Sequence, residues 1–76
     1  MDQFQTPTKL QRFLEAEGIR AAAIERRSGM SRPTFLRVRK GRDVRLSTMI
    51  RILRAVREEA GRRVRMEELF EIDPEE

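Results

Sequence analysis

Apolar positions recur at helical spacing along most of this chain, and no stretch alternates apolar and polar residues as a strand does. The first such stretch follows Thr6, which offers a capping hydroxyl, and the proline after it suits a first helical turn. Leu10, Phe13 and Leu14 then share one helical face. The pattern predicts a helix over residues 7–17.

Two short helices are expected in the middle of the chain. Residues 20–28 are rich in alanine and end at Gly29, which favours a sharp stop. Ser31 then offers a cap for a third helix over residues 32–40, and Gly41 ends that helix.

Two further helices complete the predicted architecture. A long apolar stripe runs from Leu46 to Ala60, and a short one spans Met66 to Phe70. One apolar face of each helix, together with the turn residue Met30, should form a single core. The expected core residues are Phe13, Leu14, Ile24, Met30, Phe35, Val38, Leu46, Met49, Leu53 and Phe70.

The charge is distributed unevenly, although the net charge is only +4. Basic residues greatly outnumber acidic ones over residues 20–65, whereas residues 66–76 carry acids and no base. A preference for arginine over lysine can reflect the base composition of a genome, but it does not explain why acids are so sparse in the middle. The basic middle therefore points to a polyanionic partner.

The composition argues against several other classes of protein. With no cysteine and no histidine, the chain lacks a disulfide, the common zinc signatures and any visible nucleophile–base set, so we expect neither an enzyme nor a bound metal or cofactor. The polar start carries no apolar signal-peptide core, and no apolar run is long enough to span a membrane. A cytoplasmic protein with no membrane association is the expectation.

The stretch over residues 20–41 is the most informative. Apolar residues there are spaced so that two helices can pack at a fixed angle across a tight turn at Gly29. This spacing is typical of a helix-turn-helix unit, in which the outer face of the second helix is free to enter a groove of DNA. The apolar set is Ile24, Met30, Phe35 and Val38.

The segment GIRAAAIERRSGMSRPTFLRVRKG, followed by VRLSTMIRILRAV, resembles the phage repressor and Cro-like family of regulators, also called the XRE type. The resemblance implies an all-α, five-helix lambda-repressor-like bundle, here one domain over residues 1–76 with an acidic tail at 71–76. It also implies a transcriptional regulator, a repressor, that binds a palindromic operator in double-stranded DNA as a homodimer.

The resemblance also assigns roles to individual residues of the recognition helix and its surroundings. The family's base-reading positions fall on Ser31, Arg32, Pro33 and Arg37. Its phosphate-binding positions fall on Arg20, Lys40, Arg42 and Arg45. Arginine suits base reading because it can donate two hydrogen bonds to guanine. Pro33 is either a contact to a thymine methyl or a purely structural first-turn residue, and Leu36 is either a methyl contact or packing against the following loop.

Departures from the family pattern suggest further features. Glu25 and Arg39 replace a common alanine and a common glutamate, so an ion pair between them is expected. Met66, Leu69 and Phe70 exceed what a small core must hold, so the fourth helix, which is longer than is typical, and the segment Val64–Phe70 together form a candidate dimer surface. The alternative is that they cover the base of the bundle.

Two other kinds of binding protein remain as alternatives. An antitoxin uses the same motif together with a terminal extension that binds a toxin, but the acidic segment Glu67–Glu76 is short for that purpose. An RNA-binding protein usually offers aromatic side chains for base stacking, whereas this chain has no tryptophan or tyrosine and only four phenylalanines.

Overall fold

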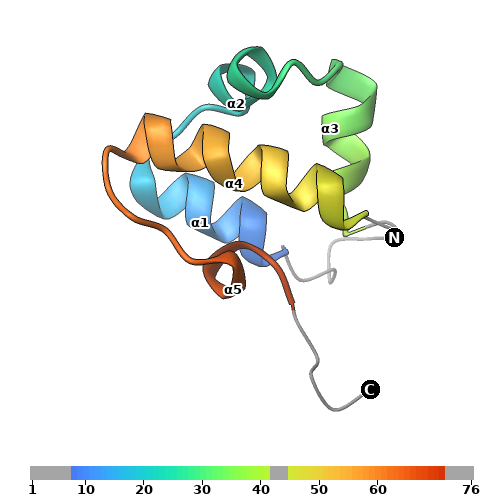
Figure 1. The fold of residues 1–76 in the computed structure, drawn as a ribbon. Helices are drawn as coiled ribbons and strands as arrows, with labels where there is room; N and C mark the ends of the chain where they lie inside the picture. The colour runs from blue at the N-terminus through green and yellow to red at the C-terminus, as the bar shows by residue number, and fades with distance from the viewer. Residues whose placement is uncertain (1–7, 42–44, 72–76) are drawn as a thin grey trace.

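The computed structural model describes residues 8–41 and 45–71, and this part of the chain is helical with no strand (Figure 1). The helices are α1 (Lys9–Glu17), α2 (Ala21–Ser28), α3 (Arg32–Arg39), α4 (Leu46–Ala60) and α5 (Met66–Leu69). The expectation of an all-α, five-helix bundle is confirmed. None of the helices described is both long enough and apolar enough to cross a membrane.

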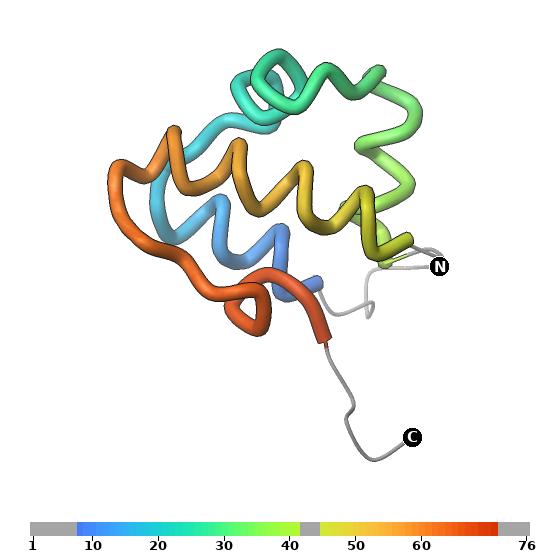
Figure 2. The backbone as a smooth tube through the Cα atoms, in the orientation of Figure 1, coloured from blue at the N-terminus to red at the C-terminus, as the bar shows by residue number. Residues whose placement is uncertain are grey.

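The longest helix, α4, runs through the middle of the bundle (Figure 1). Helix α2 packs against α4, and α5 packs against both α4 and α1. Helix α3 follows α2 across a short turn and stands at the end of the molecule where α4 begins, as the backbone path makes clear (Figure 2).

The first helix begins two residues later than the sequence pattern predicts. Its cap is Thr8, whose Oγ1 accepts a hydrogen bond from the backbone N–H of Gln11 at 3.2 Å. The same hydroxyl donates to the carbonyl oxygen of Arg39 at 2.7 Å, which ties the start of α1 to the end of α3. The predicted cap Thr6 and the proline after it lie outside the described residues.

The core confirms most of the expected residues. It comprises Leu10, Leu14, Ile24, Met30, Phe35, Val38, Ile52, Leu53, Ala55, Val56, Val64, Leu69 and Phe70. Phe13 and Met49 are only partly buried against it. Leu46 was wrongly expected inside, since it is 65% exposed. Leu46 is the first residue of α4, and the buried residues of this helix begin only at Ile52, so the start of α4 extends past the core.

The segment after α4 belongs to the core and not to a free surface. Val64 and Leu69 are buried, Phe70 is 8% exposed, and Met66 packs against the core. The prediction that Val64–Phe70 forms a dimer surface is therefore wrong, because these side chains already cover the base of the bundle.

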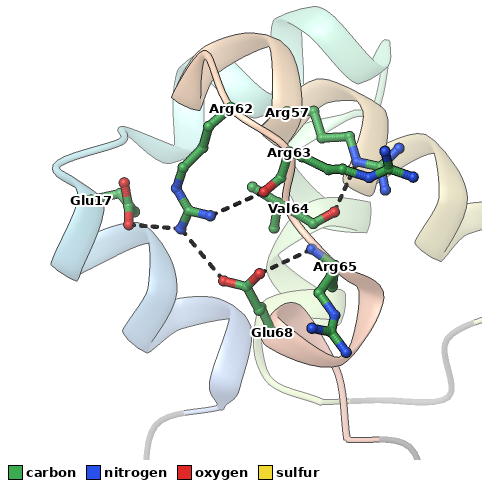
Figure 3. A network of polar contacts seen from close by, with 7 residues as sticks. All are labelled: Glu17, Arg57, Arg62, Arg63, Val64, Arg65 and Glu68. Atoms are coloured by element: carbon green, nitrogen blue, oxygen red, sulfur yellow. Dashed lines mark hydrogen bonds and ion pairs between the residues drawn. The ribbon is translucent and has the colours of Figure 1, made fainter.

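A polar network joins α1 and α5 around Arg62 (Figure 3). Nη2 of Arg62 lies 3.1 Å from Oε2 of Glu17 and 3.4 Å from Oε1 of Glu68, and the guanidinium lies 5.5 Å from the centre of the Phe13 ring. Glu68 also accepts a hydrogen bond from the backbone N–H of Arg65 at 3.1 Å, which caps α5. One arginine thus fastens the last helix to the first.

This network predicts a loss of stability in acid that depends on Glu68. The Arg65 backbone N–H, and after it Arg62, lowers the pKa of Glu68 despite its partial burial. A carboxylate with a lowered pKa stabilises the fold above the pKa of the unfolded chain, about 4.3, and this contribution disappears as the pH falls through the lower folded value. Melting temperature should therefore fall between about pH 5 and pH 3.

The matching variant is Glu68→Gln, which keeps the size of the side chain but cannot ionise. We expect it to be less stable than the parent protein at neutral pH and to lose less stability in acid. The measurement is a series of thermal melts followed by circular dichroism. Parallel curves of melting temperature against pH for the two proteins would contradict the prediction.

Candidate nucleic-acid interface

Helix α3 is held by its inner face and exposed along its outer face. Phe35 and Val38 are buried in the core, whereas Arg32, Leu36 and Arg37 are exposed. The turn before it is fixed locally: Gly29 has a φ of 72°, a left-handed conformation that other residues adopt at a cost, and Met30 anchors the turn in the core. Consequently α3 presents a basic outer face from a rigid support.

The four expected base-reading residues all lie at this exposed face. The Arg32 side chain is 81% exposed. The hydroxyl of Ser31 is engaged in capping α3, since it accepts from the backbone N–H of Thr34 at 3.4 Å and donates to the Thr34 hydroxyl at 2.9 Å. Pro33 lies in the first turn of α3, where its ring is exposed and its missing N–H costs no hydrogen bond. Of the four, Arg32 and Arg37 therefore have the groups best suited to hydrogen-bonding a base.

The expected phosphate-binding residues are spread over two places. Lys40 ends α3 and Arg45 precedes α4, so both flank the same connection, and both are exposed. Arg20 precedes α2, just after α1. The end of α1 lies beside the segment that follows α4, through the Glu17–Arg62 pair. Arg42 lies outside the described residues.

Other arginines of the basic middle are engaged within the fold. Arg27 is ion-paired with Glu59 and, at 3.1 Å, with Glu58, and these contacts raise its pKa, with the hydrogen bond to Glu59 as the largest cause. Nη2 of Arg51 donates to the carbonyl oxygen of Ser28 at 2.7 Å. Both contacts fasten α2 to α4, and no local sequence signal revealed them because the partners are far apart in the chain.

The predicted ion pair between Glu25 and Arg39 is wrong. Oε1 of Glu25 faces Nε of Arg32 at 3.9 Å, at the opposite end of α3 from Arg39. The Nε atom of Arg39 is buried and has no hydrogen-bond partner among the described residues. The reason is geometric: the last half of α2 lies beside the start of α3, so Glu25 meets the first residue of α3 and not the last.

The geometry of α2, turn and α3 agrees with a comparison against known protein families. The model of the Cro/C1-type HTH DNA-binding domain matches residues 9–75, which include every helix of the bundle. Comparisons with curated proteins and with solved structures gave no match. The family match confirms the resemblance seen in the sequence and identifies DNA as the binding partner. The chain belongs to the Cro/C1-type helix-turn-helix family of DNA-binding domains.

Proposed function

We propose that this chain, as a single domain, is a sequence-specific transcriptional regulator that reads the major groove of double-stranded DNA with α3. The observation that carries the proposal is the exposed face of α3, where Arg32 and Arg37 project from a helix fixed by Phe35 and Val38. A helix that is already rigid loses little conformational entropy when it binds. Each arginine can donate two hydrogen bonds to guanine O6 and N7.

The remaining residues at this surface divide into two groups: residues that help to read bases, called readers here, and residues that bind phosphates, called holders. Ser31 and Pro33 contribute to reading by bringing the first turn of α3 close to the base edges. Lys40, Arg45, Arg20 and Arg42 bind phosphates. These contacts fix the register of the protein on DNA without carrying sequence information.

Selection from a random pool of double-stranded DNA, with RNA present as competitor, tests this function. The proposal requires a defined consensus that persists in the presence of RNA. Recovery of DNA with no consensus, or competition by RNA at equal concentration, would overturn it. A palindromic consensus would also support a two-fold arrangement of two copies on DNA.

We further propose that the regulator is a repressor that binds a palindromic operator as a homodimer, with two copies meeting at Leu46 and Ile50. These side chains are 65% and 39% exposed, and they lie one turn apart at the start of α4. Because α4 starts next to the end of α3, a contact there would hold two copies of α3 close together. Half-sites should then be one helical turn apart, about 34–36 Å between centres.

Replacing both residues by serine tests this contact. Both side chains are exposed, so the fold should persist, whereas the apolar area that two copies bury on DNA should be lost. Since burying an aliphatic side chain contributes about 1.5–3 kcal/mol, affinity for the full palindrome should fall at least about tenfold, with little change for an isolated half-site. Gel-shift titrations on the two DNAs measure this.

The control for the dimer contact is Ala22→Ser, an exposed change of similar polarity on α2. It should leave both affinities as they are. Equal affinities of the Leu46→Ser/Ile50→Ser variant and the parent protein for the palindrome would contradict the proposed meeting point.

A further inference from the structure

Glu25 occupies an unusual position in the basic part of the molecule. It is the only acidic residue in the described chain between Gly18 and Arg57, and its side chain is only 17% exposed. The one ion pair that its carboxylate forms with a described residue is the contact to Nε of Arg32, at 3.9 Å. A carboxylate is thus held largely away from water beside an arginine of the recognition helix.

Each of these two charges is stabilised by the other. Burying most of a carboxylate removes much of its hydration, and an opposite charge nearby compensates for that loss. Arg32 is the first residue of α3, where the helix dipole disfavours a cation, and α3 has no acidic residue in its first turn. Glu25 supplies from α2 the negative charge that α3 itself lacks.

The contact with Glu25 also leaves the two Nη groups of Arg32 free to bind a base. It is made through Nε, and the Arg32 side chain is 81% exposed. The two Nη groups of a guanidinium form the edge that matches O6 and N7 of guanine. An exposed arginine normally loses considerable side-chain freedom when it binds a base, so an attraction that favours one orientation of the guanidinium in advance lowers that cost.

We propose that Glu25 is a positioning residue for base recognition: it holds the guanidinium of Arg32 by Nε so that the Nη edge faces a guanine. This inference rests on the proposed function, because it requires Arg32 to read a base. It predicts that the base pair under Arg32 is read as G·C, and that discrimination at this base pair depends on a residue of α2 that does not itself touch DNA.

The decisive variant is Glu25→Gln, which keeps the size of the side chain and removes its charge. Losing a negative charge should slightly strengthen binding to any DNA, so the quantity to measure is the ratio of affinities for the preferred site and for random DNA at one salt concentration. We expect this ratio to fall about threefold to tenfold, part of the full effect of losing an arginine–guanine contact. Glu15→Gln, an exposed acid on α1, is the matched charge control and should leave the ratio unchanged.

A double-mutant cycle separates positioning from a purely structural role. In an Arg32→Ala background, Glu25→Gln should no longer change the ratio, since there is no guanidinium left to position. A fall that persists in that background, an unchanged ratio, or a raised ratio would each overturn the proposal. A raised ratio would mean that Glu25 holds Arg32 away from DNA.

A second variant, Glu25→Asp, keeps the test possible if Glu25→Gln fails to fold. It keeps the charge and withdraws the carboxylate by one methylene, so thermal melts should stay close to those of the parent protein while the ratio falls. An unchanged ratio for this variant would overturn the positioning role. If the parent protein itself shows no preferred site, the proposed function fails first, and this outcome is distinct from any result with Glu25 variants.

Discussion

Replacing Phe35 by alanine is expected to lower the free energy of unfolding by about 3–5 kcal/mol. Phe35 has no exposed surface and is the largest fully buried side chain in the described core. Truncation removes its apolar contacts and leaves a cavity that the neighbouring helices fill only in part. Because small domains have total stabilities of only about 5–15 kcal/mol, a large share of the folded population should be lost on mild heating.

The adjacent residue provides a matched control. Leu36→Ala removes an aliphatic side chain that is 41% exposed on the same helix, so it should change stability by less than about 1 kcal/mol. Urea titrations followed by circular dichroism measure both variants. Similar midpoints for the two would mean that α3 is not fastened through Phe35, and that the recognition face has no rigid support there.

Replacing Arg37 by alanine is expected to weaken binding to the preferred DNA site by about 1–3 kcal/mol, with a much smaller effect on random DNA. Arg37 is exposed on the outer face of α3, one turn beyond Pro33, and makes no ion pair with a described residue. Removing it deletes hydrogen bonds to base edges and leaves the bundle intact. Fluorescence anisotropy on the two DNAs measures the change.

Arg45→Ala is the comparison for a residue that holds a phosphate. It should weaken binding to both DNAs by similar factors. It should also flatten the slope of log affinity against log salt by about 0.9, because the variant neutralises one phosphate fewer. If Arg37→Ala and Arg45→Ala behave alike, the division into readers and holders is incorrect, even if the protein binds DNA.

The helix-turn-helix unit could be predicted from the sequence because its signals are local. A glycine at residue 29 stops one helix, and Ser31 caps the next. The apolar residues of the two helices and of the turn, Ile24, Met30, Phe35 and Val38, are spaced so that the pair can pack together. The exposed positions of Arg32 and Arg37 then follow from the burial of Phe35 and Val38.

Other features could not be predicted because they depend on residues distant in the chain. The apolar pattern of α4 does not show how far along the helix its neighbours reach. Helices α2 and α5 pack against α4, and its buried residues begin at Ile52, whereas Leu46 at the start of the helix is exposed. Likewise, the ion pair predicted from the sequence joined Glu25 to Arg39, whereas the structure joins Glu25 to Arg32. The choice between the two arginines depends on how α2 lies along α3.

The most direct test of base reading by α3 is to repeat the selection from random double-stranded DNA with three proteins: the parent chain, Arg37→Ala and Arg45→Ala. The parent chain should yield a palindromic consensus. Arg45→Ala should yield the same consensus at lower affinity, whereas Arg37→Ala should lose the preference at one base pair in each half-site. Recovery of the complete consensus with Arg37→Ala, or its loss with Arg45→Ala, would contradict the claim that α3 reads the sequence.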